Sequence, residues 1–345
     1  MYQTAATSDK KRLLGALQGR LIDRVPNFEV LVDDPTVSYV LGRPVSGGHT
    51  LANIDAGDYM EFARRVGQDA VGLCFYDNPF FYCDAEGSLK RRDFRIRTRT
   101  DLERLLPLTM DHLEDRFRLL REYRAKTAGT ELALFALTGD FFTQAYDSAF
   151  GFDAFMLLLY DDPALVEEYL ELHADFYARL VRRLVECGID FLYIGDDIAH
   201  KGGTLISPRD MRRLWLPRMR RVMQPALERG IPVLYHSDGN IWDMLDDIVG
   251  LGIGGLNPIE PYGMDITQVR RRFGRDLALF GNLDVGAVLS RGTPDTVAAA
   301  ARALIDAVGR DGPLVLASSH SITPNVPPEN YLAMIETAQT YGRLG

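Results

Sequence analysis

The sequence predicts an α/β protein that folds as a single (β/α)8 barrel, the architecture also called a TIM barrel. About eight short apolar runs of the kind that forms buried parallel strands alternate with helical patterns, roughly one run per 30 to 50 residues. The length of 345 residues suits one large barrel. Polar side chains cluster directly after the apolar runs, at the strand ends where barrels of this type carry their active sites.

The apolar runs are bounded by Gly, Pro and polar residues. The predicted strands are 27–32, 69–76, 131–137, 191–194, 231–235, 255–260, 277–280 and 313–317. We also expect a hairpin over 87–97 and, because it is rich in Gly and Pro, a loop over 33–50 at one barrel end. A doubly wound open sheet is the alternative, but no strand is followed by a GxGxxG phosphate loop.

Helical patterns fill the intervals between the strands. They are predicted after Ser8, over 57–66, 145–159 and 163–187, from Pro208 onward, and over 328–340. Ser207 followed by Pro208 is a helix start signal, because Ser caps the first amides and Pro fits the first turn. No linker interrupts the alternation, so we expect an N-terminal extension with a first helix over 1–25 and one barrel domain over 26–345.

Composition excludes several classes of function. The net charge of −9 argues against general affinity for nucleic acid or for anionic membranes. The three cysteines, Cys74, Cys83 and Cys187, form neither a disulfide framework nor a CxxC pair, which indicates a reduced, cytoplasmic setting. The N-terminus lacks the apolar core of a signal peptide, and no apolar run is long enough to span a bilayer.

The most informative stretch is 231–242, IPVLYHSDGNIW, in which a buried strand ends in polar residues. His236 and Asp238 are two residues apart, so on a strand they point to the same side and into one cavity. Gly239 permits a turn directly after them. The pair is either half of a metal site or an acid/base pair, and the alternative is a turn in which Asp238 caps the next helix.

Other strands end in similar polar residues. They are Asp77, Asp140, Asp196, Asp197, Glu260, Asn282, Asp284 and His320. In a closed barrel these side chains gather around one mouth, which predicts a polar site there. Aromatic residues follow two of the strands. Phe80, Phe81 and Tyr82 form either a substrate wall or a local hydrophobic plug, and in the first case they wall an apolar pocket together with Phe141 and Phe142.

Four motifs occur in a fixed order: GID at 188–190, ISP at 206–208, GNLD at 281–284, and HSI followed by VPPEN within 320–330. In this order they resemble the uroporphyrinogen decarboxylase superfamily, which includes cobalamin-dependent methyltransferases. The resemblance covers the chain from about residue 135 to its end and implies a (β/α)8 barrel.

The sequence departs from both branches of that superfamily. The resemblance implies an arginine-rich RQAGR-type motif after the first strand of a decarboxylase, but residues 27–34 read NFEVLVDD, which would repel a tetra-anionic porphyrinogen. For the methyltransferase branch, the resemblance implies an HxC motif at 236–238 and a further zinc-binding cysteine at position 320. Here Asp238 and His320 replace the thiolates, which argues against thiol substrates but not against zinc.

Together these features assign expected roles. The predicted metal ligands are His236, Asp238 and His320. The predicted catalytic residues are Glu260, Asp196 and Asp197, with Glu260 as a fourth ligand or a base. The predicted substrate-binding residues are Asp77, Phe80, Phe81, Tyr82, Asp140, Phe141, Phe142 and Asn282. Metal-free acid/base chemistry and a merely hydrogen-bonded polar mouth remain alternatives, and Asn282 and Asp284 alternatively only fix their loop.

The leading hypothesis is a zinc-dependent methyltransferase that moves a methyl group from a small O-, N- or S-methylated substrate to a corrinoid. A separate protein would carry the corrinoid, because the chain lacks the DxHxxG pattern. The second hypothesis is a metal-free decarboxylase or lyase of a smaller carboxylated substrate, which an arginine such as Arg43 at the mouth would favour. The third is a non-catalytic small-molecule binding barrel. A homodimer is compatible with the sequence, and no nucleic-acid or membrane partner is expected.

Overall fold

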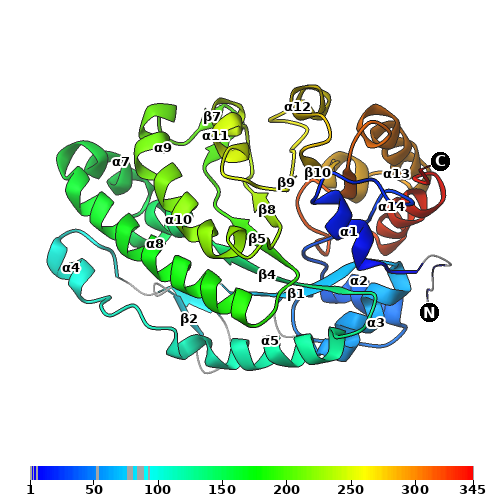
Figure 1. Ribbon diagram of the computed structural model, residues 1–345, viewed down its shortest axis with the longest axis horizontal. Helices are drawn as coiled ribbons and strands as arrows, with labels where there is room; N and C mark the ends of the chain where they lie inside the picture. The colour runs from blue at the N-terminus through cyan, green and yellow to red at the C-terminus, as the bar shows by residue number, and fades with distance from the viewer. Residues whose placement is uncertain are drawn as a thin grey trace.

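The computed structural model describes residues 2, 4, 7–51, 54–75, 81–83, 89–91 and 94–344, with 81–83 and 89–91 described by their backbone alone. A seven-stranded parallel sheet curves around a common interior, and helices cover its outer face (Figure 1). In spatial order its strands are β1 Ala70–Cys74, β4 Ala133–Gly139, β5 Phe191–Gly195, β8 Val233–His236, β9 Gly255–Asn257, β10 Ala278–Leu283 and β11 Leu314–Ser318. Each overlaps a predicted run, so these predictions are confirmed.

The predicted first strand, 27–32, is present as an irregular segment rather than as a regular strand. It lies beside β11 through isolated parallel bridges that join Asn27 to Leu316 and Val32 to Ile322. The segment supplies the eighth stave, and the chain is a (β/α)8 barrel. Both termini lie on the same side of the molecule in Figure 1.

Buried side chains interrupt the backbone ladder of this first stave. The Ser318 N–H of β11 donates to the Glu29 carboxyl group, and the Ser318 hydroxyl donates to it at 3.0 Å. On the other side, the Glu29 N–H donates to Gln68 Oε1 at 3.2 Å. Side chains thus bind backbone groups that would otherwise pair between strands. For this reason the segment does not form the regular strand that its apolar pattern predicted.

Glu29 gives a pH-dependent prediction for stability. Burial raises the pKa of Glu29 to about 8, although the hydrogen bonds from Ser318 lower it. The folded protein therefore keeps a proton that the unfolded chain releases near its ordinary pKa, so stability falls as the pH rises from the unfolded to the folded pKa. The unfolding free energy of Glu29→Gln minus that of the wild type should therefore increase by about 4 kcal/mol when the pH is raised from 5 to 9. Urea unfolding at both pH values measures this, and a constant difference would contradict it.

Aromatic rings fill the barrel interior below the mouth. The ring of Phe28 meets those of Phe135, Phe191 and Phe280 edge-on, with centroids 5.3, 5.9 and 6.3 Å apart. Leu17, which follows the first helix, joins this cluster at the start of the strands, where it contacts the backbone of β9 so closely that a Cβ on Gly255 would lie 2.8 Å from it. The lower part of the interior is therefore packed with apolar side chains.

The helices lie outside the sheet and follow the strands along the chain. They are α1 Lys10–Ala16, α2 Asp34–Leu41, α3 Ala56–Val66, α4 Arg99–Glu103, α5 Glu114–Thr127, α6 Phe141–Gln144, α7 Phe152–Asp161, α8 Pro163–Glu186, α9 Pro208–Leu214, α10 Leu216–Leu227, α11 Leu245–Val249, α12 Ile266–Phe273, α13 Pro294–Leu304 and α14 Pro328–Thr340. Short 3-10 or π segments are η1 Asp111–Leu113, η2 Ala145–Ala149, η3 Trp242–Met244, η4 Val285–Ser290 and η5 Ile305–Gly309. Within the described ranges, no helix has the length and hydrophobicity needed to cross a membrane.

The prediction of a loop over 33–50 is wrong in its first part, which forms α2. The Asp33 carboxylate accepts the Thr36 N–H at 3.3 Å, and Pro35 occupies the first turn. An acidic residue followed by Pro in the first turn is a helix start signal, and Asp162 with Pro163 begins the long helix α8 in the same way. The Gly and Pro content of the stretch reflects the loop after Leu41 and not the helix itself.

The predicted hairpin is displaced toward the N-terminus. β2 Phe81–Cys83 pairs antiparallel with β3 Leu89–Arg91, so only the second strand lies in the predicted range of 87–97. A second hairpin, β6 Ala199–His200 with β7 Gly203–Thr204, follows β5. The predicted helix over 145–159 is divided by Gly151, whose φ of 82° is unfavourable for other residues and separates η2 from α7.

Candidate metal centre at the barrel mouth

Three adjacent strands bring the central residues of the site to one level. In the parallel pairing, Gly195 at the end of β5 is the partner of His236 at the end of β8, and His236 is the partner of Asn257 at the end of β9. Asp197 and Asp238 follow two residues beyond the ends of β5 and β8. Because the register aligns these ends, their side chains meet at the mouth.

Asp197, His236 and Asp238 form a compact cluster. Their potential ligand atoms all lie within 4.8 Å of one another. His236 Nε2 is 3.5 Å from Asp197 Oδ1 and 3.8 Å from Asp238 Oδ1. These distances exceed those of good hydrogen bonds but are close to the separation of about 3.4 Å expected between two ligands of one tetrahedral zinc ion.

The environment of Asp238 fits a cation. Its Oδ1 atom is buried and has no hydrogen-bond partner within the described ranges. A buried carboxylate oxygen without a donor is costly, and a metal ion would satisfy it. The Asp238 N–H donates to Asp197 Oδ1 at 2.8 Å, so the backbone ties the two acidic residues together. Burial and the neighbouring carboxylate of Asp197 raise the pKa of Asp238, against the opposing effect of His236.

The other edge of His236 is held by hydrogen bonds. Its Nδ1 lies 3.1 Å from Asn257 Oδ1 and 3.2 Å from Tyr193 Oη, and the tyrosine hydroxyl also donates to Asn257 Oδ1. Burial by itself would lower the pKa of His236, but Asp197 and Asp238 outweigh it, so the pKa lies above its ordinary value. Metal-binding histidines are commonly held in this way through their second ring nitrogen.

His320, one of the predicted metal ligands, lies at the edge of the cluster rather than within it. Its Nε2 is 3.8 Å from Asp238 Oδ2, the carboxylate oxygen that faces away from His236, and its side chain is 55 % exposed. Asp197, predicted as a catalytic residue, occupies the third position of the compact cluster instead.

Asp140, predicted to bind substrate, stands next to the cluster. It adopts a left-handed backbone conformation with a φ of 71°. A Cβ built on Gly195 would lie 3.4 Å from Asp140 Oδ1 and 3.7 Å from His236 Cδ2, so both side chains flank this glycine. Burial and the charge of Asp197 raise the pKa of Asp140 to about 7. A carboxyl group with such a pKa can exchange a proton near neutral pH.

Asp196 was predicted to be catalytic, but the structure directs it away from the mouth. It is fully buried, and its carboxylate accepts the N–H groups of Phe142 and Thr143, the Thr143 hydroxyl and the Trp215 indole N–H at 2.8 to 3.1 Å. With its oxygens already occupied, it anchors the end of β5 to α6 and to the end of α9. Sequence adjacency to Asp197 suggested a pair, but consecutive side chains point in opposite directions.

Glu260 and Asn282 support the loops around the cluster. Glu260 Oε2 accepts the N–H of Gly239 at 2.7 Å and so holds the turn after Asp238. The Asn282 amide donates to the Ile259 carbonyl at 2.6 Å. Asp284 Oδ1 accepts the N–H groups of Gly286 and Ala287 in η4 at 2.8 Å each. The alternative in which Asn282 and Asp284 fix the loop after β10 agrees with these contacts.

Two members of the predicted aromatic wall lie in the hydrophobic core. Phe141 and Phe142 are completely buried, and the ring of Phe142 packs edge-on against Tyr146 and Phe155 behind the barrel wall. They face this core because Asp140 turns the chain and α6 begins there. Asp77 and Phe80 lie outside the described residues, as do the side chains of Phe81 and Tyr82, so their predicted roles stay predictions.

An arginine at the barrel mouth was expected to favour a carboxylated substrate over a methylated one. Arg43 does not reach the mouth, because it pairs with Asp58 and Glu61 of α3 at 2.6 and 2.9 Å. Arg116 of α5 instead lies at the end of β1, where its Nε and Nη2 atoms donate to the Cys74 carbonyl at 3.1 and 2.8 Å. Arg116, Tyr193 and Asn257 are not among the site residues that the sequence predicted.

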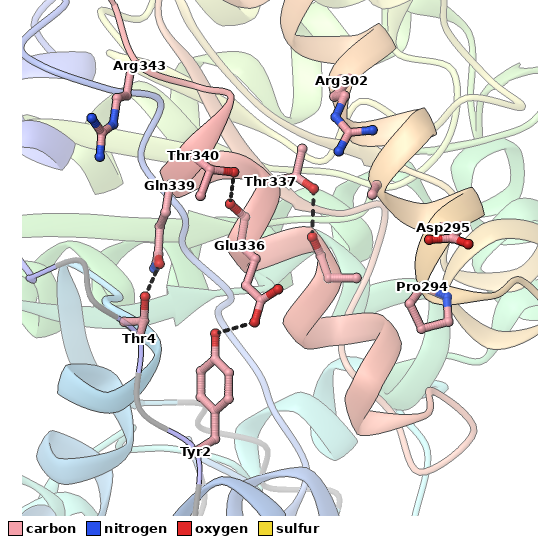
Figure 2. Close-up of a pocket in the computed structure, with 12 residues that line it drawn as sticks. Tyr2, Thr4, Pro294, Asp295, Arg302, Glu336, Thr337, Gln339, Thr340 and Arg343 are labelled. Atoms are coloured by element: carbon pink, nitrogen blue, oxygen red, sulfur yellow. Dashed lines mark hydrogen bonds between the residues drawn. The ribbon is translucent and has the colours of Figure 1, made fainter.

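A separate groove lies on the outside of the barrel. It has a volume of about 480 Å³ and is formed by α13, α14 and residues of the N-terminal segment (Figure 2). Figure 2 shows Tyr2 donating to Glu336 on one side and the guanidinium groups of Arg302 and Arg343 on the other. Its lining contains none of the predicted site residues, so the barrel mouth remains the candidate site.

Comparison with known proteins places the chain in a family. The family model of uroporphyrinogen decarboxylase matches residues 91–341. Uroporphyrinogen decarboxylase of Methylococcus capsulatus is 28% identical over 186 residues, which cover 53% of this chain and 51% of that protein. The Crocosphaera subtropica enzyme is 22% identical over 274 residues, covering 77% of this chain and 74% of that protein.

The fold comparison agrees with the barrel. A solved structure of a methyltransferase from Methanosarcina mazei superposes with a TM-score of 0.74 and 21% identity, covering 96% of this chain and 98% of that chain. This likeness concerns the fold. The chain spans about half the length of the Methylococcus relative, whereas the family model extends over most of the barrel. The protein therefore belongs to the uroporphyrinogen decarboxylase family.

Proposed function

We propose that this protein is a zinc-dependent methyltransferase that takes a methyl group from a small methylated substrate and passes it to a corrinoid on a separate protein. The observation that carries the proposal is the cluster of Asp197, His236 and Asp238 around a buried carboxylate oxygen without a donor. The superposition on the Methanosarcina mazei methyltransferase is consistent with it.

In this proposal His236, Asp197 and Asp238 hold the metal. Bound zinc supplies Lewis-acid chemistry by polarising the heteroatom that carries the methyl group. The C–heteroatom bond would break with its electron pair remaining on the heteroatom, and the corrinoid of the partner protein would serve as the methyl acceptor. Asp140, whose pKa is raised to about 7, is placed to donate a proton to the departing heteroatom.

The second candidate is a decarboxylase or lyase. The curated relatives are named uroporphyrinogen decarboxylase. Against a porphyrinogen substrate stands the first stave, because residues 27–34 contain no arginine that could bind its carboxylates. A metal-free decarboxylase also leaves the Asp238 oxygen without a partner.

Metal content and methyl transfer test the proposal together. Protein purified with added zinc is expected to retain about one equivalent of metal. It should then methylate free cob(I)alamin when supplied with methylated phenols, amines or thioethers, which mass spectrometry detects as demethylated product. Less than about a tenth of an equivalent of metal would count against the methyltransferase. Release of carbon dioxide from a carboxylated substrate by the metal-free protein would establish the alternative.

A further inference from the structure

Three neighbouring strands place Tyr193, His236 and Asn257 together in the barrel interior. His236 and Asn257 are register partners, and Tyr193 lies two residues before Gly195, the partner of His236 on the other side. Tyr193 and Asn257 are 1 % and 5 % exposed, so neither reaches solvent. The phenol ring stands edge-on to the imidazole, with ring centroids 6.0 Å apart.

The hydrogen bonds among the three side chains determine where the protons lie. The Asn257 Oδ1 atom can only accept, so the contact of 3.1 Å to His236 Nδ1 requires a proton on Nδ1. Tyr193 donates its own proton to Asn257 Oδ1 and therefore presents an oxygen lone pair to Nδ1, 3.2 Å away. All three contacts are favourable only when Nδ1 carries the proton.

The consequence appears at the opposite ring nitrogen. A neutral imidazole protonated at Nδ1 has its lone pair on Nε2, which faces Asp197 Oδ1 and Asp238 Oδ1 at 3.5 and 3.8 Å. Three electron-rich atoms then converge without a proton between them. A divalent cation at their centre converts this repulsion into coordination.

We propose that Asn257 and Tyr193 are a positioning pair that holds His236 in the Nδ1–H tautomer and aims its Nε2 lone pair at a divalent cation. The identity of that cation as a catalytic zinc rests on the proposed function, whereas the tautomer follows from the contacts of Asn257 and Tyr193 alone. Nothing in the sequence motif around His236 indicates either partner, because both come from neighbouring strands.

The pair can be tested without any assay of activity. In metal-free protein, long-range ¹H–¹⁵N spectra at a pH that keeps the ring neutral report the His236 tautomer, with the resonance assigned by comparison with His236→Gln. Competition with a chelating indicator measures the zinc dissociation constant. The variants are Asn257→Leu, which removes the acceptor at similar volume, Asn257→Asp, which keeps it, and Tyr193→Phe. Tyr331→Phe is the control, since this buried phenol belongs to α14 and its hydroxyl has no hydrogen-bond partner within the described ranges.

The wild type is expected to show the Nδ1–H tautomer. Asn257→Leu should populate the Nε2–H tautomer and weaken zinc binding about 10- to 100-fold, the usual effect of losing such a partner. Asn257→Asp should retain the tautomer and the affinity, Tyr193→Phe should weaken zinc binding less than Asn257→Leu, and Tyr331→Phe should change neither property.

Two results would overturn the positioning pair. One is a wild-type His236 in the Nε2–H tautomer, a measurement that needs no variant to fold. The other is an Asn257→Leu protein that keeps both the tautomer and a zinc affinity within about twofold of the wild type. If the wild type shows the Nδ1–H tautomer but binds no zinc, the positioning pair stands and the zinc-dependent function fails.

Discussion

Replacing His236 by alanine is expected to reduce zinc binding and methyl transfer by more than about a hundredfold each. Loss of a residue that merely orients a ligand costs about 10- to 100-fold in metal affinity, and loss of the ligand itself should cost more. The fold should survive, because His236 ends its strand at the mouth and is 24% exposed. The cost in stability should be about 1 kcal/mol, because Asn257 loses its contact with His236 but keeps the hydrogen bond from Tyr193.

Metal content by emission spectrometry, the zinc dissociation constant and thermal unfolding measure these effects. His200→Ala is the matched control, since His200 is an exposed histidine of the β6–β7 hairpin whose Nδ1 accepts the Gly202 N–H. It should leave zinc binding unchanged. A His236→Ala protein with full zinc content and unchanged activity would show that the metal centre described here is not the functional site.

Asp197 and His320 distinguish two possible ligand sets, and this comparison has the second largest expected effect. Asp197→Asn should weaken zinc binding more than about tenfold, because the amide is a much poorer ligand than the carboxylate. It still offers an oxygen to the Asp238 N–H, so the local fold should be preserved. His320→Ala should leave zinc content unchanged, because His320 faces the outer oxygen of Asp238.

The two variants are compared for zinc affinity and for the ratio of kcat to KM. A loss of activity in His320→Ala with zinc retained would assign His320 to the substrate side of the mouth. The opposite pattern, with zinc lost in His320→Ala and kept in Asp197→Asn, would restore the ligand set of His236, Asp238 and His320 that the sequence predicted.

The sequence by itself determined the barrel and the central pair of the site. Alternation of apolar runs with helical patterns reports strand and helix directly, because burial on both faces requires continuous apolar strands. The spacing of His236 and Asp238 is likewise a local property, since residues two apart on a strand share a face. The acidic-Pro signal before α2 was also present, but the Gly and Pro around it obscured it.

Only the tertiary structure decided how the remaining polar residues divide between chemistry and support. Asp196 and Asp197 are adjacent in sequence, but one is enclosed by donors from α6 and Trp215 while the other joins His236. Asn257 became a partner of His236 through the register of β8 and β9, which no local pattern encodes. Strand ends identify the mouth of a barrel, but the register between strands and the packing of the following loops determine which side chains meet there.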